Sequence, residues 1–138
     1  MVNVFLGGTC NGSNWRDELI PLLDNNKIEV FNPVVDKWDD KAQAIEDYHK
    51  QNDDFCLYVL TPEMIGIYSI FEVAGTKQPD KTLVCMLPER KGKVFPEVIM
   101  NNFVKIKKDL INNGFRVFES LEDIANFFDS TIEYDEKY

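Results

Sequence analysis

A single carboxylate, Glu72, stands in an otherwise apolar stretch of this chain, where its two neighbours on either side are all apolar. The stretch follows a strand-like run, Phe55 to Leu60, and a turn at Thr61-Pro62. A buried carboxylate is costly unless it is paired or used. Open α/β sheets also bind their ligands just beyond the carboxyl ends of their strands. Glu72 is therefore the first candidate for a direct chemical role, the alternative being a partly exposed helical glutamate.

Four further carboxylates precede the strand-like run, namely Glu46, Asp47, Asp53 and Asp54. If one of them faces Glu72, the two pKa values are pushed apart. One nucleophilic carboxylate and one acid/base carboxylate would suit glycosyl transfer. The alternative is a solvated helix face followed by a turn, and this applies to most of the four.

Two polar residues come just before Glu72 on the predicted helix 67–74. Ser69 lies about one helical turn before Glu72, so its hydroxyl could bond the carboxylate or a substrate oxygen. Tyr68 could close the pocket. Both are predicted substrate-binding residues.

The loop after the first strand is rich in glycine. Gly7, Gly8 and Gly12 lack the GxGxxG spacing of dinucleotide-binding loops. Glycines still let backbone N–H groups approach an anion, helped by the amino end of the next helix. We therefore predict substrate contacts from Gly7, Gly8 and Thr9, with a plain tight turn as the alternative.

The helix that follows this loop begins with Trp15 and Arg16. If Arg16 faces the cleft, it is a natural clamp for a phosphate or carboxylate. Otherwise Trp15 belongs to the core and Arg16 pairs with a carboxylate such as Glu18 or Asp36. Both residues are predicted substrate contacts, and the sequence leaves the choice open.

The second strand ends in a polar segment with an aromatic residue, Asn32-Pro33-Val34-Val35-Asp36-Lys37-Trp38. Asn and Asp often form turns, but an aromatic beside them also suits a base or sugar pocket. Asn32, Pro33 and Asp36 are predicted to bind substrate on the second interpretation.

Apolar runs alternate with helical patterns along the chain. Strands are predicted at residues 2–6, 28–31, 55–60, 81–87 and 115–118, and helices at 15–23, 39–51, 67–74, 97–112 and 120–128. This alternation predicts a five-stranded parallel sheet covered on both faces, a flavodoxin-like or Rossmann-like three-layer α/β sandwich. We expect one domain over residues 1–130 and an acidic C-terminal tail over 131–138.

Composition narrows the classes of partner. The 138 residues carry a net charge of −9, which argues against nucleic acid as a partner, because binding that polyanion needs clustered Lys and Arg. No apolar run is long enough for a membrane span, and the first residues enter a strand without a basic leader. We expect a cytoplasmic protein with free thiols at its three cysteines.

Other chemistries find little support in the sequence. The chain has one histidine, His49, in a polar helix, so thiol or serine catalysis lacks a base. Soft ligands do not occur at the spacing of a structural zinc site. We expect no cofactor and no metal.

Several blocks together resemble the nucleoside 2-deoxyribosyltransferase-like proteins. The resemblance runs from Val2 to about Leu87 and is strongest before Gly75, and its blocks are FLGGTCNGSNWRDELIP, FNPVVDKW, IEDYHK and LYVLTPEMIGIYSIFEVAG. It implies a flavodoxin-like fold, a nucleoside or nucleotide substrate and a homodimer or larger homo-oligomer. It also implies that Glu72 attacks the anomeric carbon of a deoxynucleoside or deoxynucleotide.

The resemblance gives roles to other residues as well. Gly7 and Gly8 match the loop that contacts the sugar, and Ser69 matches a small position before the nucleophile. Glu46 or Asp47 matches an auxiliary acidic residue, and Asp54 an acidic residue that opens the third strand.

This chain departs from the family pattern at two places. Gly66 stands where the transferases often carry a base-reading aspartate, and Glu63 is the nearest acidic substitute. Family sites are also often completed by a neighbouring subunit, to which Asn101 or Asn102 would correspond. The leading hypothesis is 2-deoxyribosyl transfer or hydrolysis through Glu72. The alternatives are a non-catalytic module that binds a nucleotide or ADP-ribose-like ligand, and an NAD-type glycohydrolase.

Overall fold

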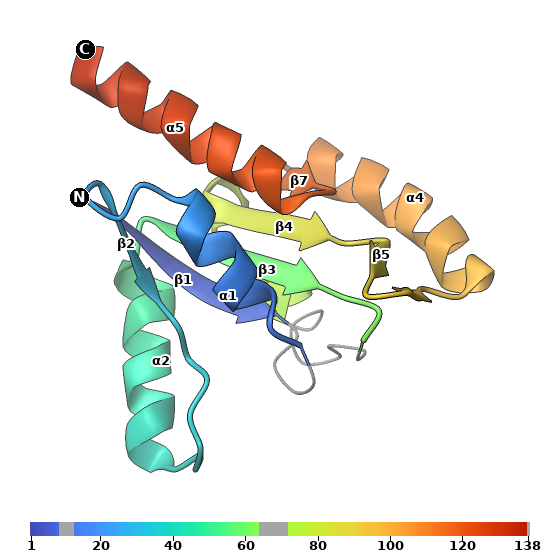
Figure 1. Ribbon diagram of the computed structural model, residues 1–138, viewed down its shortest axis with the longest axis horizontal. Coiled ribbons are helices and arrows are strands. Elements are labelled where there is room, and N and C mark those ends of the chain that lie inside the picture. Colours follow the sequence, from blue (N-terminus) through green and yellow to red (C-terminus); the bar gives the residue numbers. More distant parts are fainter. Residues whose placement is uncertain (9–12, 64–71, 138) are drawn as a thin grey trace.

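The computed structural model describes residues 1–8, 13–63 and 72–137, and its largest feature is one parallel sheet of five strands (Figure 1). In their order across the sheet the strands are β2 (Ile28–Phe31), β1 (Val2–Gly8), β3 (Phe55–Leu60), β4 (Thr82–Met86) and β7 (Arg116–Phe118). Every neighbouring pair is parallel. Counted along the sheet's own five strands, this is the 2-1-3-4-5 order of flavodoxin-like folds, so the predicted fold class is confirmed.

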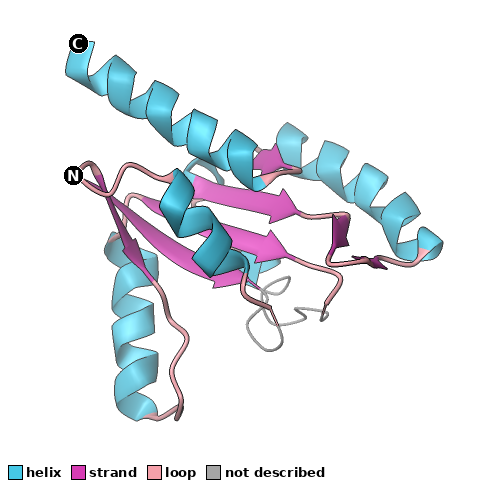
Figure 2. Cartoon of the chain, in the orientation of Figure 1, coloured by secondary structure: helices cyan, strands magenta, loops and turns pink. Residues whose placement is uncertain are grey.

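Helices cover both faces of the sheet (Figure 2). On one face, α1 (Trp15–Leu19) and α5 (Leu121–Lys137) contribute Trp15, Leu19, Ile124 and Phe128 to the larger apolar core, and none of these four side chains is exposed. Removal of this apolar surface from water is the main force that holds the layers together.

The opposite face carries a smaller apolar cluster. It contains Phe5, Cys56, Tyr58, Val73 and Val84. Leu110 from α4 (Glu97–Asn112) packs against this cluster. The helix α2 (Asp40–Asn52) joins the same face, since the ring of its His49 stacks on Phe31 with the ring centroids 3.8 Å apart. Glu72 belongs to this layer, in a helical segment over residues 72–75.

Helix ends follow local capping chemistry. The side chain of Asp39 accepts a hydrogen bond from the backbone N–H of Ala42 at 2.7 Å, and Ser120 accepts one from Asp123 at 3.1 Å. Such caps satisfy backbone donors that have no partner within the helix. After α4, Gly114 takes a φ of 92°, the left-handed conformation that favours glycine. These caps at Ser120 and Asn113-Gly114 confirm two predicted boundaries.

Two helices differ in length from the prediction. The helix α1 ends at Leu19 and a 3-10 turn, η1 (Ile20–Leu22), follows, because Pro21 cannot continue the α-helical bonds. The helix α5 continues to Lys137, well past the predicted end near Phe128. No Gly or Pro interrupts this segment, and Ile132 is buried against the core. The acidic stretch that we predicted as a tail is therefore helical as far as residue 137.

The prediction missed a short hairpin, β5 (Glu89–Arg90) and β6 (Lys93–Val94). Its turn consists of Lys91 and Gly92, both with positive φ. Two-residue hairpin turns of type I′ need positive φ at both positions. A second short element, η2 (Pro79–Lys81), leads into β4. Among the helices that the structure describes, none is long and apolar enough to cross a membrane.

Candidate functional site

Glu72 lies on the α2 face of the sheet, in the helical residues 72–75. Its Oε2 lies 2.5 Å from the Nζ of Lys50 and accepts a hydrogen bond from the Tyr58 hydroxyl at 3.3 Å. Its side chain is only 12% exposed. Burial raises the pKa of Glu72 above its ordinary value, and the hydrogen bond and charge of Lys50 oppose that rise. The carboxylate is thus held by a cation and a phenol.

Glu46 reaches Glu72 through this lysine. Lys50 and Glu46 are four residues apart on α2, and Nζ of Lys50 lies 3.0 Å from Oε1 of Glu46. Glu46 is buried, with 8% exposure. The predicted carboxylate pair therefore takes the form of two carboxylates that share one ammonium.

A polar cavity of about 260 Å³ opens beside this cluster, slightly smaller than the roughly 300–1,000 Å³ of drug-sized sites. Its walls come from α2, from β3 and from the segment that leads into β4. The lining residues are Lys50, Cys56, Tyr58, Glu72, Gly75, Thr76, Gln78, Lys81 and Thr82. A cavity of this size, with hydroxyl, amide and charged groups in its wall, has room for a sugar-sized polar group.

Gly7 acts on this site through Tyr58. A Cβ at Gly7 would lie 2.6 Å from the ring carbons Cδ1 and Cε1 of Tyr58. The missing side chain lets the phenol ring pass over β1 so that its hydroxyl reaches Glu72. Burial and the charge of Glu72 raise the pKa of Tyr58, which keeps the phenol protonated and able to donate. Gly7 thus leaves the space that the Tyr58 ring occupies, and its contact with a substrate stays a prediction.

Three other predicted carboxylates lie away from Glu72. Asp47 accepts a hydrogen bond from Gln43 on the exposed side of α2. Asp53 pairs with Nδ1 of His49 at 3.0 Å. Asp54 accepts a hydrogen bond from the backbone N–H of Asn3 at 2.8 Å, which joins the amino ends of β3 and β1. Asp47 and Asp54, predicted as catalytic, therefore have local structural contacts and no contact with the Glu72 cluster.

Trp15 and Arg16 are parts of the core. Trp15 is completely buried, and Arg16 is 3% exposed. Both Nε and Nη2 of Arg16 donate to the carbonyl of Leu6, at 3.2 and 3.0 Å, and its guanidinium lies 4.4 Å from the centre of the Trp15 ring. The structure thus supports the core alternative for Trp15. Arg16 is thus almost completely buried and bonds the backbone near the end of β1.

The segment after β2 forms a turn at the surface. The side chain of Asn32 accepts a hydrogen bond from the backbone N–H of Val34 at 3.0 Å, which is a typical turn contact. Pro33 is buried, whereas Asp36 and Trp38 are exposed. None of the residues 32–38 lines the cavity beside Glu72. Thr9, Gly66, Tyr68 and Ser69 lie outside the described residues.

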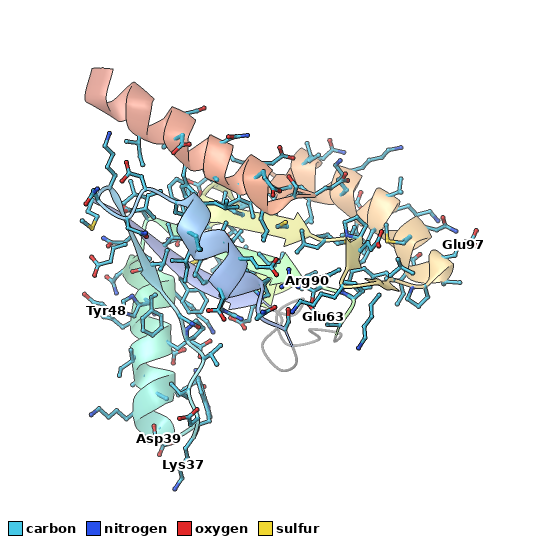
Figure 3. All side chains as sticks on the ribbon, in the orientation of Figure 1. Lys37, Asp39, Tyr48, Glu63, Arg90 and Glu97 are labelled. Carbon is cyan, nitrogen blue, oxygen red and sulfur yellow. The ribbon has the colours of Figure 1, made fainter. Side chains whose placement is uncertain are left out.

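A second polar cluster lies at the carboxyl edge of the sheet, around Arg90 of the β5–β6 hairpin. Nε of Arg90 is 2.5 Å from Glu63, Nη1 is 2.7 Å from Glu18, and Nη2 donates to Asn14 at 2.7 Å. Figure 3 shows Arg90 and Glu63 directed toward one another. Glu63 also accepts a hydrogen bond from Ser13 at 2.9 Å. Glu63, the acidic substitute for a base-reading aspartate, is therefore engaged inside the protein.

Arg90→Met is expected to lower the free energy of unfolding by about 3 kcal/mol or more, because Glu63, only 7% exposed, would keep a buried charge without its cation. Urea denaturation would measure this change. Lys107→Met is the control, since Lys107 and Glu119 form an exposed pair, 43% and 55% accessible, that contributes about 0–1 kcal/mol. Equal losses in the two variants would contradict the assignment.

Sequence reasoning missed Lys50 and Tyr58 as parts of the site. The four-residue spacing of Glu46 and Lys50 on a predicted helix was a signal for their ion pair. Tyr58 was hidden in the apolar run of β3, and only the register of β3 beside Gly7 shows its role. Among the described residues, no group of three or more His, Cys, Asp or Glu is arranged to hold a metal ion.

Comparison with known proteins adds the decisive observation. The family model for nucleoside 2-deoxyribosyltransferase-like proteins matches residues 1–89. The chain belongs to this family. The matched segment includes α2, β3, β4 and Glu72, and therefore every residue that lines the Glu72 cavity. No curated protein matches the chain. Family membership indicates a glycosyl-transfer role and a nucleoside as the kind of substrate.

For this nucleoside 2-deoxyribosyltransferase-like protein, the match ends at the β5–β6 hairpin. Arg90, α4, β7 and α5 all lie beyond residue 89. Arg90 is nevertheless bonded to Glu18 and Glu63 inside the matched segment. The last third of the chain is thus joined to the family part by buried charges as well as by the sheet.

Proposed function

We propose that this protein breaks N-glycosidic bonds of deoxynucleosides or deoxynucleotides through a covalent glycosyl-enzyme on Glu72. One observation carries the proposal, namely a largely buried carboxylate at a polar cavity with an ammonium on its Oε2. A nucleophilic carboxylate needs to be ionised and near the reacting carbon, and the lysine favours the ionised form.

The reaction has two displacements. A carboxylate oxygen of Glu72 bonds to the anomeric carbon while the carbon–nitrogen bond breaks, and the base leaves with the bonding electrons and takes up a proton from water. A second base, or water, then attacks the same carbon and releases the carboxylate. Two inversions give overall retention of configuration, as in retaining glycosidases. The acceptor decides between transfer and hydrolysis.

Base exchange tests this proposal directly. The protein would be incubated with a deoxynucleoside and a second free base, and the products separated by chromatography. The appearance of the second nucleoside supports transfer, and release of free base without exchange supports hydrolysis. Neither product, with deoxynucleosides and deoxynucleotides of all four bases, would reject the proposed function.

The activity is expected to fall on the acid side at a higher pH than for an ordinary glutamate. Glu72 attacks only when it is ionised, and its pKa is raised, so protonation removes the nucleophile at a less acidic pH. The pH profile of kcat/KM measures this limb in the free enzyme. A profile that stays flat down to the ordinary glutamate pKa of about 4.3 would contradict the assignment.

A non-catalytic binding module is the second candidate. The observation that favours it is the engagement of Glu63 by Arg90 and Ser13, which leaves that carboxylate bonded within the protein. Calorimetry would show binding of a nucleotide or ADP-ribose-like ligand without turnover. Heat of binding that is unchanged by Glu72→Gln would support the binding module and reject the nucleophile.

A further inference from the structure

Lys50 occupies the centre of the Glu72 cluster. It lies in the last turn of α2, its side chain is 19% exposed, and its Nζ lies 5.7 Å from the centre of the Phe5 ring. The same nitrogen contacts Glu72 at 2.5 Å and Glu46 at 3.0 Å. One ammonium therefore faces two carboxylates from two different segments of the chain.

We propose that Lys50 is a positioning residue for Glu72, and that Glu46 anchors its ammonium so that it holds the Glu72 carboxylate at the mouth of the cavity. The inference rests on the proposed function, because Glu72 is a nucleophile only there. It goes beyond that function by assigning a task to a lysine and by changing the task of Glu46. Glu46 anchors a cation in place of acting as the acid/base partner.

The electrostatics of the cluster agree with this arrangement. In the described part of the chain, the ionisable groups around Glu72 are Glu46 and Lys50 from α2, Cys56 and Tyr58 from β3, and Lys81 from η2. Lys81 donates to the backbone carbonyls of Gln51 and Asp53 at 3.2 and 3.1 Å, so its ammonium caps the carboxyl end of α2. Lys50 is the cation in direct contact with Glu72. Burial lowers the pKa of Lys50, but its two carboxylates outweigh burial and raise that pKa above the ordinary value, so Lys50 stays charged.

A purely structural role for Lys50 makes a different prediction. If Lys50 only pins α2 to the segment 72–75, its removal lowers stability and leaves the titration midpoint of Glu72 unchanged. If Lys50 positions and ionises Glu72, its removal leaves two carboxylates facing each other without their shared cation. Glu72 then takes up a proton at a higher pH.

The test follows Glu72 by carbon-13 NMR in the full chain, with labelled glutamate and Glu72→Gln to assign the signal. Lys50→Met is expected to move the titration midpoint of Glu72 upward by at least about one pH unit. Lys50→Arg keeps the cation and should leave the midpoint close to that of the unmodified protein. Lys41→Met, an exposed lysine on the same helix, is the matched control and should change nothing.

A second variant keeps the inference testable if Lys50→Met does not fold. Glu46→Gln keeps an amide oxygen that can accept from the ammonium of Lys50, so the anchoring contact persists. It removes the negative charge that raises the pKa of Glu72, so the midpoint is expected to move downward. Opposite movements in Lys50→Met and Glu46→Gln support the inference. A midpoint that is unchanged in a folded Lys50→Met protein, or that rises in Glu46→Gln, would overturn it.

Activity provides the readout that separates this inference from the proposed function. Lys50→Met should lose kcat at neutral pH and recover it as the pH is raised past the new midpoint, because the nucleophile then ionises without help. Loss that does not recover at high pH would reject the role of Lys50 in keeping Glu72 ionised. Midpoints that move as expected in a protein without base exchange or hydrolysis would reject the glycosidic function and leave the contact between Lys50 and Glu72 established.

Discussion

Glu72→Gln is expected to reduce base exchange or hydrolysis by at least about 1,000-fold, because an amide cannot form the glycosyl ester through which both displacements pass. The change is nearly isosteric and retains an oxygen that can accept from Tyr58. The fold should therefore persist, and circular dichroism and urea denaturation would check this. Glu29→Gln, an exposed glutamate on the edge strand β2, is the control and should keep full activity.

A trapping experiment tests directly whether Glu72 forms the covalent glycosyl-enzyme. A 2-fluoro-2-deoxy nucleoside slows the second displacement, so the glycosyl-enzyme should accumulate and appear as added mass on the intact protein. Peptide mapping should place the added mass on Glu72 and find none in the Glu72→Gln variant. An adduct on Glu46, or full activity in Glu72→Gln, would overturn the nucleophile assignment.

The sheet could be predicted from the sequence because each strand is a short apolar run bounded by turn residues. The runs at 28–31 and 55–60 coincide with β2 and β3, and the other three strands differ by one or two residues at their ends. Strands buried on both faces read as continuous apolar segments, and the helices between them require parallel pairing. The β5–β6 hairpin was not predicted, because strands of two residues are too short to show an alternation of apolar and polar residues.

The site was less predictable, because chain position does not tell which way a side chain points. Glu46 and Asp47 are adjacent on α2, but a helix turns by about 100° per residue. Glu46 is therefore buried beside Lys50, whereas Asp47 faces solvent. Asp54 directly precedes β3, at the amino end of that strand. Its carboxylate therefore lies beside β1 and accepts a hydrogen bond from the backbone N–H of Asn3. Glu46, Asp47 and Asp54 are close in sequence, and only the packing of the folded chain shows that their side chains have different surroundings.

The cavity beside Glu72 lies over one face of the sheet, and side-chain packing explains this position. Because Glu72 follows β3 along the chain, the sequence predicted a site just beyond the carboxyl ends of the strands. In the described part of that edge, Arg90 forms ion pairs with Glu63 and Glu18. The carboxylate of Glu72 lies over the sheet face, because Gly7 leaves space for Tyr58 and the ammonium of Lys50 draws the carboxylate toward α2.

Gly8→Ala is expected to lower the free energy of unfolding by about 3 kcal/mol or more, which is the range of strain and overpacking together. Gly8 has a φ of 108°, which L-residues with a side chain rarely adopt. A Cβ there would lie 2.2 Å from the carbonyl oxygen and 2.6 Å from the nitrogen of Val59. These are backbone atoms of the central strand β3, so they cannot move aside without breaking the pairing of β1 with β3.

Gly75→Ala is the matched control for this prediction. A Cβ at Gly75 meets no atom within 4 Å, and the residue belongs to the helical segment 72–75. Alanine favours helix over glycine by about 1 kcal/mol, so stability should be unchanged or slightly higher. Urea denaturation of both variants measures the difference, and equal stabilities would contradict the close contact of β1 and β3. Because β3 also carries Tyr58, the Gly8 variant should lose its glycosidic activity together with its fold, whereas Glu72→Gln should lose activity alone.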